Sequence, residues 1–458
     1  MNYVSQHMVR KTVHPQLYQY LSENTQLAKN LHNAALFRVR QIFTGWDKTG
    51  EERCPTQTEV FDEVSLLEKT CPSVHVRRNM SYLHLEKLLR VTDNPDFFSA
   101  LPMQSAQGVV KQVVQDWKNW LKQLKDYKKS PEKYAGKPKM PGYIKGEKTT
   151  FTITNQDAVL YPVYENGSYR GMELKLPRIK ERLFLSNLPD TADLREVKVV
   201  PFYGTFLLSL TIQSKEPPFY PDMPFMAGID FGQDNTATLV CNDRTAVVYK
   251  GGAILAENQM FVKRRASAVS VITKGHEHMR ASSHHLDRLS VHHECFIKDM
   301  LHKLSPQIIQ YCVDHRAGIL VLGVNKGWKQ NIHIGKKNNQ NFVSIPFYRL
   351  RHMIWYKAMR AGITVIEQEE SYTSKADITA MDRIPVYGKE PDGFHFSGRR
   401  IKRGLYRTSA GYCINADCNG GANILRKAIP DAWKQVTDFR FLAYPVRVDF
   451  HDLNRKPA

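Results

Sequence analysis

Apolar residues in the first part of the chain recur with the spacing of helices. Between residues 15 and 40 they follow Pro15, a residue suited to a first helical turn. From Met103 to Tyr127, valines, leucines and two tryptophans make one apolar face, and lysines make the other. Both stretches are therefore predicted to be helices that bury one side.

The period changes to two between residues 150 and 215, which predicts β-strands. Asn166-Gly167 favours a hairpin turn because both residues tolerate positive φ. A small β-barrel or a curved sheet is the simplest architecture for this region.

The second half of the chain mixes strand and helix patterns. A helix is predicted from about Phe347 to Ala361. Five short strands are predicted at Met226–Phe231, Thr236–Cys241, Thr245–Tyr249, Gly318–Val324 and Thr364–Gln368. A β-meander followed by alternating helices and strands is the order of an RNase H-like fold.

Positive charge dominates the composition. The 458 residues include 65 Lys and Arg against 45 Asp and Glu, a formal net charge of +20. This excess costs self-repulsion unless a polyanion neutralises it, so nucleic acid is the first partner to consider. No apolar run approaches the length of a membrane span, and we find no basic amphipathic anchor. We therefore expect a soluble protein without a membrane partner.

The seven cysteines are scattered and form no CxxC pair. Such a set fits reduced thiols rather than a disulfide framework. The charged N-terminus is not followed by an apolar segment, so we expect no secretory signal. Both features favour a cytoplasmic protein.

Asp230 is a single acid within an otherwise apolar strand pattern, Ala227-Gly-Ile-Asp-Phe-Gly232. Strand interiors disfavour Asp, so we prefer a functional role to that of a turn or cap residue. Hydrolysis of a phosphodiester with two magnesium ions needs carboxylates that converge from different elements. The small residues beside Asp230 would let a phosphate approach.

Three acids, Glu367, Glu369 and Glu370, lie at the end of the last predicted strand. Neighbouring carboxylates repel, so this cluster is costly without a cation beside it. With a period of two, Glu367 and Glu369 share one face and Glu370 takes the other. The pattern leaves open which face would meet a metal.

Asp417 stands just before a helical run from Ala422 to Lys427. An Asp in this place is either an N-cap or a further metal ligand, and the residues favour neither interpretation.

A basic linker runs from Lys118 to Lys148, with ten lysines, three acids and several helix-breaking prolines and glycines. It is either a solvated loop or a segment that contacts phosphates. The candidate contacts are Lys118, Lys122, Lys125, Lys128, Lys129, Lys137 and Lys139.

Six ordered blocks between residues 228 and 427 resemble the OrfB/TnpB family of insertion-sequence-encoded RNA-guided nucleases, which is related to type V CRISPR effectors. The blocks are Gly228-Ile-Asp-Phe-Gly232, Gly323-Val-Asn-Lys-Gly-Trp-Lys-Gln330, Asn338-Asn-Gln-Asn-Phe-Val-Ser-Ile-Pro346, Glu369-Glu-Ser-Tyr-Thr-Ser-Lys375, Phe396-Ser-Gly-Arg-Arg-Ile-Lys-Arg-Gly-Leu-Tyr406 and Asn415-Ala-Asp-Cys-Asn-Gly420. The N-terminal half is similar more loosely, through its tryptophan-rich helix and the linker after it.

The resemblance implies a multidomain α/β and α+β protein with an RNase H-like (RuvC) nuclease domain. It divides the chain into residues 1–50 as the N-terminal part of a wedge region, 51–127 as a helical recognition region, 128–222 as a β-barrel wedge region with the basic linker, and 223–458 as the RuvC-like domain. A degenerate zinc-ribbon region is expected at about 385–413.

The family's catalytic triad carries over as Asp230, Asp417 and one glutamate. Most members place this glutamate where the chain has Gly323, and glycine cannot ligate a metal. A subset with a rearranged glutamate resembles Glu370-Ser-Tyr-Thr-Ser374, so Glu370 is the expected third ligand and Glu369 the fallback. Asp230 would bridge two Mg²⁺ ions, and Glu370 and Asp417 would each complete one.

Many family members also carry two CxxC pairs that hold zinc. Only Cys413 and Cys418 stand near that region here, so we expect no zinc. Trp328, between Lys326 and Lys329, is either a base-stacking platform or a packed aromatic. The basic residues in the ribbon region are either nucleic-acid contacts or solvated: Arg399, Arg400, Lys402, Arg403 and Arg407. Six histidines lie between residues 276 and 293: His276, His278, His284, His285, His292 and His293. They have no acidic or cysteine partners at ligand spacing, so we do not expect a transition-metal site there.

The resemblance implies an RNA-guided DNA endonuclease of a transposon-associated type. It would bind a guide RNA from its own locus and cut double-stranded target DNA beside a short flanking motif, in the cytoplasm of a prokaryote and at its nucleoid. A companion transposase is a further expected partner. Two alternatives stay open: a guided DNA-binding regulator without nuclease activity, motivated by Gly323, and a transposase that acts directly on element ends in DNA recombination.

Overall fold

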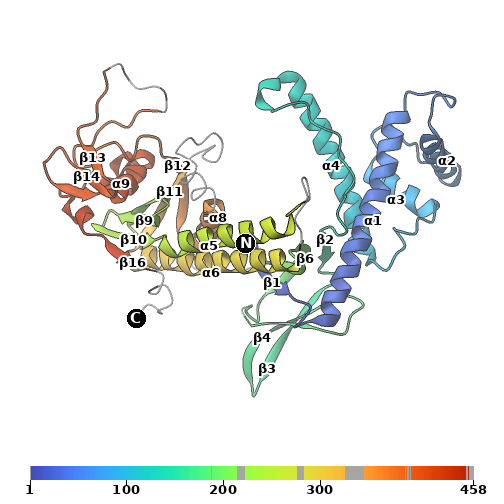
Figure 1. Cartoon of the computed structure of the whole chain (residues 1–458), viewed down its shortest axis with the longest axis horizontal. Helices are drawn as coiled ribbons and strands as arrows, with labels where there is room; N and C mark the ends of the chain where they lie inside the picture. Colours follow the sequence, from blue (N-terminus) through green and yellow to red (C-terminus); the bar gives the residue numbers. More distant parts are fainter. Residues whose placement is uncertain are drawn as a thin grey trace. The chain divides into compact units, whose positions relative to one another are not determined.

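The computed structural model describes residues 2–186, 188–213, 222–275, 283–324, 345–386, 388, 391, 393–449 and 452. The chain folds into two units, an N-terminal unit, Met1–Lys215, and a C-terminal unit, Glu216–Ala458 (Figure 1). One hydrophobic core lies in the N-terminal unit, and two lie in the C-terminal unit, one on each face of its main sheet.

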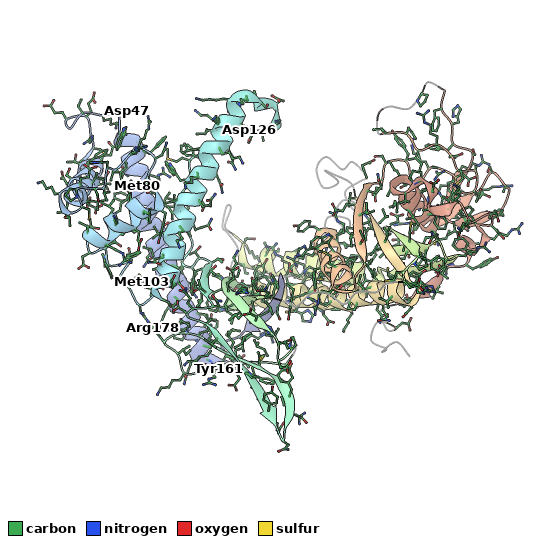
Figure 2. The ribbon with its side chains drawn as sticks, turned by 180° about the vertical axis from the view of Figure 1, so that it is seen from behind. Asp47, Met80, Met103, Asp126, Tyr161 and Arg178 are labelled. Carbon is green, nitrogen blue, oxygen red and sulfur yellow. The ribbon has the colours of Figure 1, made fainter. Side chains whose placement is uncertain are left out.

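Helices follow the first strand of the N-terminal unit and confirm both predicted helical stretches. They are α1 (Pro15–Gly45), α2 (Pro55–Thr70), α3 (Tyr82–Val91) and α4 (Met103–Lys129), followed by the short 3-10 helix η1 (Pro131–Lys133). α4 buries Trp117 and Trp120 against Phe43 of α1, with ring centroids 5.2 and 5.5 Å apart. Figure 2 shows Met103 and Asp126 near opposite ends of α4.

The first part of the basic linker lies in α4, and the part that follows α4, residues 130–148, is held against α1 by hydrogen bonds. The Asn33 side chain donates to the carbonyl of Ile144 at 3.0 Å and accepts its N–H at 2.9 Å. Arg40 donates to the carbonyl of Pro141 at 2.7 Å. Because these bonds use the linker's backbone, they leave its lysine side chains at the surface.

The strands of the N-terminal unit form two open sheets. One has the order β1-β7-β6-β2 and the other β3-β4-β5. The strands are β1 (Asn2–Val9), β2 (Phe151–Thr154), β3 (Val159–Glu165), β4 (Ser168–Lys175), β5 (Leu183–Leu185), β6 (Asp193–Phe202) and β7 (Thr205–Gln213). Asn166 and Gly167, with φ of 50° and 78°, make the predicted hairpin turn between β3 and β4.

The curved-sheet alternative therefore describes this region better than a barrel. Among the described strands, the edge strands β1 and β2 of the larger sheet do not pair with each other, so no ring closes. The resemblance assigns α1 to the wedge region. In the structure α1 contacts β6 and β7 of that region, and it also contacts α2, α3 and α4 of the region assigned to recognition.

A six-stranded sheet forms the centre of the C-terminal unit, in the order β12-β11-β8-β9-β10-β16. β9 is antiparallel to both β8 and β10, and β11 runs parallel to β8 and β12. The strands are β8 (Phe225–Asp230), β9 (Asn235–Cys241), β10 (Thr245–Lys250), β11 (Ala317–Val324), β12 (Thr364–Glu369) and β16 (Val446–Val448). This order and these directions are those expected of an RNase H-like fold, and the five predicted strands are confirmed.

Helices cover both faces of this sheet (Figure 1). On one face, α5 (Gly252–Ile272), α6 (His284–Asp314) and α8 (Phe347–Arg360) share a core with Ile229 and Leu322. On the other, α9 (Ala416–Ala428) packs on Val240 and Val321. The remaining elements are a small sheet of β13 (Arg399–Lys402), β14 (Leu405–Arg407) and β15 (Cys413–Asn415), and the 3-10 helices η2 (Pro430–Trp433) and η3 (Arg440–Ala443). In the part of the chain that the structure describes, no helix combines the length and apolar character needed to cross a bilayer.

Replacing Leu85 of α3 by Ala is expected to lower the free energy of unfolding of the N-terminal unit by about 2–5 kcal/mol, because the side chain is fully buried and its loss leaves a cavity. Leu83→Ala, in the same helix, removes a side chain that is 61% exposed and should change stability by less than about 0.5 kcal/mol. Urea denaturation followed by tryptophan fluorescence measures both values. Equal losses for the two variants would contradict the burial of this helix.

Candidate active site

Asp230 is the last residue of β8, an inner strand of the six-stranded sheet. It pairs with Thr238 of β9, and Ile229 before it pairs with Leu322 of β11. Ile229 belongs to the core under α6 and α8, so its neighbour Asp230 projects on the α9 face. The acid thus stands at the carboxyl end of β8 rather than inside the strand.

α9 packs on β8 through glycines. A Cβ on Gly228 would overlap the carbonyl oxygen of Gly421, and a Cβ on Gly420 would lie 2.6 Å from Asp230 Oδ2. Any larger residue at these positions would force the helix and the strand apart. The glycines therefore set the short distance between the Asp230 carboxylate and the first turn of α9.

Asp417 lies in that first turn, and it is not the residue that caps the helix. The N-cap is Asn415, whose side chain accepts hydrogen bonds from the backbone N–H groups of Asp417 at 2.9 Å and Cys418 at 3.1 Å. The Asp417 carboxylate instead accepts a hydrogen bond from Asn235 Nδ2 at 2.6 Å and lies 3.5 Å from Arg400. Asp417 is therefore not the N-cap of α9, because the side chain of Asn415 caps this helix.

Glu369 and Glu370 have different surroundings. Glu369 forms an ion pair with Lys427 of α9 at 2.8 Å and accepts hydrogen bonds from the backbone and hydroxyl of Ser371. Burial would raise the pKa of Glu369, but these hydrogen bonds outweigh it and hold the pKa below its usual value. Glu369 therefore has a structural partner for its charge.

Glu370 points into the space beside Gly323. A Cβ at position 323 would lie 2.7 Å from Glu370 Oε2, so the carboxylate fills the volume that a side chain on β11 would need. Burial raises the pKa of Glu370 to about 7, the charge of Glu369 adds to the rise, and Arg351 and Lys427 oppose it. The absence of a side chain at 323 is thus what gives Glu370 its position.

The predicted alternation of the three glutamates fails at the end of β12. Glu367 lies 3.8 Å from Arg351 of α8, whereas Glu369 reaches Lys427 of α9, so these two do not share one side of the sheet. β12 is the edge strand and ends at Glu369, where the pleat no longer dictates side-chain direction.

Asp230, Glu370 and Asp417 are coupled by their charges. Burial raises the pKa of Asp230 well above its ordinary range, and the negative charges of Glu370 and Asp417 raise it further, while Arg400 opposes them. Carboxylates that disfavour one another in this way create a demand for a cation. The structure thus brings together the three acids expected from the sequence, from β8, the end of β12 and α9.

The chemistry of these donors fits a divalent cation. All three supply oxygen ligands, which Mg²⁺ prefers, and Gly323 and Gly420 keep bulk away from two of the carboxylates. Within the described ranges, no group of three His, Cys, Asp or Glu side chains already has the arrangement of a metal site. Asn235 and Arg400 hold Asp417 in this state of the molecule.

Two buried asparagines connect α9 to the loop that follows Glu370. Asn419 donates to the carbonyl of Ala376 at 2.8 Å and accepts from the N–H of Ile378 at 3.2 Å. Asn423 donates to the carbonyls of Thr373 at 3.0 Å and Ala376 at 2.7 Å. The sequence analysis missed both, although two asparagines four residues apart in an otherwise small and apolar helix share one face and mark a polar contact.

The basic residues expected to contact nucleic acid lie at the surface wherever they are described. Lys118, Lys122, Lys125, Lys128 and Lys129 are exposed on α4, and Lys137 and Lys139 are exposed on the linker. Arg399, Arg400, Lys402 and Arg403 are exposed on β13 and its turn, where Arg403 also pairs with Asp234. Lys326, Trp328 and Lys329 lie outside the described residues.

The cysteines and histidines singled out in the sequence have ordinary surroundings. Cys418 is buried in α9, Cys413 is partly exposed in β15, and both are free thiols. His293 stacks on Phe261 and hydrogen-bonds Asn258, which joins α6 to α5. His276 and His278 fall outside the described residues.

Comparison with known proteins gives matches over parts of the chain. Residues 214–329 match the model of the OrfB_IS605 family, described as a probable transposase, and residues 347–424 match the Cas12f1-like TNB domain. A TnpB-like protein, ORF457 of Acidianus two-tailed virus, is 24% identical over 210 residues, which cover 44% of this chain and 42% of that protein. Two parts of the chain are thus similar to TnpB/OrfB proteins, and its match to the viral relative spans less than half of that relative's length.

Solved structures of Cas12 proteins are similar over most of the chain. A Cas12f1–sgRNA–target DNA complex is 14% identical, covering 89% of this chain and 82% of that one, with a TM-score of 0.49. The mini-RNA-guided endonuclease CRISPR-Cas phi3 is 10% identical, covering 93% and 92%, with a TM-score of 0.41. At these TM-scores the superpositions are partial.

Gly228→Ala is expected to destabilise the C-terminal unit by about 1–3 kcal/mol, because the added methyl group meets backbone of α9 that cannot move aside without lifting the helix. Gly252→Ala is the matched control: nothing lies within 4 Å of its added Cβ, and Ala favours the start of α5. Thermal denaturation by circular dichroism measures both. A neutral Gly228→Ala would show that α9 does not depend on this contact.

Asn423→Ala should cost about 1–3 kcal/mol, since it leaves the buried carbonyls of Thr373 and Ala376 without a donor. Asn119→Ala, on the exposed side of α4, should change stability by less than about 0.5 kcal/mol. Chemical denaturation of the two variants decides, and losses of equal size would refute the role given to Asn423.

Proposed function

We propose that the chain is an RNA-guided DNA endonuclease that hydrolyses phosphodiester bonds with Asp230, Glu370 and Asp417. The observation that carries this proposal is that these three carboxylates come together on one face of the sheet. Burial raises the pKa of Asp230, and the charges of Glu370 and Asp417 raise it further. Buried acids with raised pKa values, here Asp230 and Glu370, are typical of a catalytic site rather than of a surface cluster. Similarity to TnpB/OrfB proteins supports the same conclusion.

Asp230, Glu370 and Asp417 would hold two Mg²⁺ ions through their carboxylate oxygens. When bound, the ions would activate water and stabilise the leaving oxygen. The chain's own contribution is geometric. Gly420 keeps α9 against Asp230, the empty position at Gly323 admits Glu370, and Lys427 keeps Glu369 turned to α9.

The positive charge of the chain supports a polyanionic partner. A formal net charge of +20 and the exposed lysines of α4 and the linker suit contact with the phosphates of a guide RNA and target DNA. In such a protein, pairing with the guide selects the target, and the protein holds the duplex by charge and shape. A companion transposase and a location at the prokaryotic nucleoid belong to the same proposal.

A guided cleavage assay distinguishes the acids that are needed for catalysis from their neighbours. We expect Glu370→Gln to reduce plasmid cutting by at least about a hundredfold, because it removes one charge of the triad, and Asp230→Asn and Asp417→Asn to do the same. Glu369→Gln and Glu367→Gln remove neighbouring acids engaged with Lys427 and Arg351 and should leave most of the activity. The assay uses the protein co-expressed with its native downstream RNA, magnesium, and a target beside randomised flanking bases.

Enrichment of one flanking motif among the cut plasmids would support RNA guidance. Loss of cutting with Glu369→Gln and not with Glu370→Gln would sink the assignment of Glu370. Retention of full activity in all five variants would place the catalytic centre elsewhere.

A guided DNA-binding protein without nuclease activity is the second candidate. It is favoured by the contacts of Asp417 with Asn235 and Arg400, which hold the carboxylate without a metal. The same plasmid experiment separates the two candidates: a wild-type protein that retains a defined RNA and binds its target, but does not cut, is a binder. A protein that purifies without RNA and binds element ends would instead be a transposase that acts directly on DNA.

A further inference from the structure

One side of α8 carries aromatic side chains at the surface with helical spacing. Tyr348 is 73% exposed and Trp355 is 42% exposed, and His352 between them is also exposed. The spacing of four and three residues places the three on one stripe. The buried face of the helix is a different one, formed by Phe347, Leu350, Ile354 and Ala358. We refer to Tyr348, His352 and Trp355 as the aromatic stripe.

The rings of the stripe are arranged for stacking. Tyr348 and His352 are nearly parallel, with an angle of 12° between their planes and 6.5 Å between their centroids. Nearly parallel exposed rings can stack on the flat faces of bases. Exposed rings leave apolar surface in contact with water, which is unfavourable unless another molecule covers it.

Positive charge borders the stripe on both sides. Arg351 reaches Glu367 of β12, whereas Arg349 reaches Glu294 of α6 at 2.6 Å, so the two arginines flank opposite sides of the stripe. α8 contains three arginines and one lysine and has no acidic residue of its own. Aromatic rings between cations bind single-stranded nucleic acid through base stacking and phosphate contact.

Cations are also crowded where α8 meets α6. Burial lowers the pKa of Lys357 to about 8, and the charge of Arg360 lowers it further. Burial lowers the pKa of His302 to about 4, with the charges of Lys357 and Lys298 adding to the effect. Lys357 donates to the hydroxyl of Ser305 at 2.7 Å, a neutral partner that does not offset its charge.

α8 begins near the carboxyl end of β8, on the face of the sheet opposite to the one that α9 and Asp230 share. The ring of Phe347, at the start of α8, lies 6.0 Å from that of Phe231, the residue after Asp230. One turn further on, Arg351 is close enough for its charge to act on Glu370. α8 leads back to β12, which runs parallel to β8, so the helix starts at the edge of the sheet where the carboxylates stand.

We propose that the aromatic stripe of α8 binds single-stranded DNA by base stacking and guides the strand that the neighbouring carboxylates would cut. This inference rests on the proposed function, since it names the substrate strand of that same site. The occupant is a polyanion with flat bases, because rings and flanking arginines suit this chemistry and a purely apolar partner would leave the cations uncovered.

The test measures binding without cleavage. The full chain, purified with its co-expressed RNA, is titrated in EDTA with a fluorescein-labelled thymidine 20-mer, and fluorescence anisotropy gives the affinity. Tyr348→Ala and Trp355→Ala should each weaken binding by about fivefold to a hundredfold, the range expected for loss of one stacked base. Trp355→Phe keeps a ring and should stay within about threefold of the wild type.

Tyr444→Ala is the matched control, because Tyr444 is 88% exposed in the same unit but lies outside α8. This variant should bind as the wild type does. In parallel, oligonucleotides with 5-iodouracil are irradiated, and the crosslinked peptides are identified by mass spectrometry. Crosslinks on Tyr348, His352 or Trp355 support the stripe as the binding surface.

Unchanged affinity in Tyr348→Ala and Trp355→Ala, together with crosslinks only outside α8, would overturn the inference. So would a change in molar mass by light scattering with unaltered DNA binding, because the stripe would then be a contact between copies of the protein. If the wild type does not cut DNA with magnesium and guide RNA, the nuclease proposal fails. Reduced binding in the stripe variants would still support single-strand binding in that case.

Discussion

The close contact between α9 and β8 is the constraint on which the candidate site depends. Gly228 lets helix and strand approach to a distance at which no Cβ fits between them, and Gly420 leaves room for the Asp230 carboxylate beside the helix that carries Asp417. Burial raises the pKa of Asp230, and the charges of Glu370 and Asp417 raise it further. Packing energy from the surrounding core must therefore hold the acids together until a cation offsets their charge.

A second constraint fixes the remaining acid. Glu370 follows an edge strand, where a side chain is poorly directed, so its place depends on the contacts around it. Asn419 and Asn423 attach the loop after Glu370 to α9, and Lys427 of that helix takes the charge of Glu369. One helix thus carries Asp417 and also organises the chain on both sides of Glu370. The space at Gly323 completes the arrangement, because a carboxylate from the neighbouring strand occupies it.

The fold leaves much of the excess positive charge at the surface. The linker after α4 is fixed by backbone hydrogen bonds from Asn33 and Arg40, which leaves its lysines exposed. On α8, arginines flank exposed rings while a separate face packs on the sheet. The flanking arginines of α8 also pair with Glu294 and Glu367, so in that helix the same side chains serve both the fold and the cationic surface.

The sequence by itself predicted part of the secondary structure and two of the acids. Hydrophobic periodicity located α1, α4, α8 and five strands of the C-terminal sheet, because burial on one side imposes a period on the chain, but it did not locate α2, α3, α5 or α6. Asp230 and Asp417 were recognisable from local pattern and family resemblance. Only the tertiary structure decided between Glu369 and Glu370 as neighbour of Asp230, since the answer depends on Lys427 and on the empty volume at Gly323, which lie 58 and 47 residues from these glutamates in the chain. It also decided that Asn415 caps α9 and that Asn419 and Asn423 bind the loop. Contacts between distant segments have no period along a chain, and so no sequence pattern reports them.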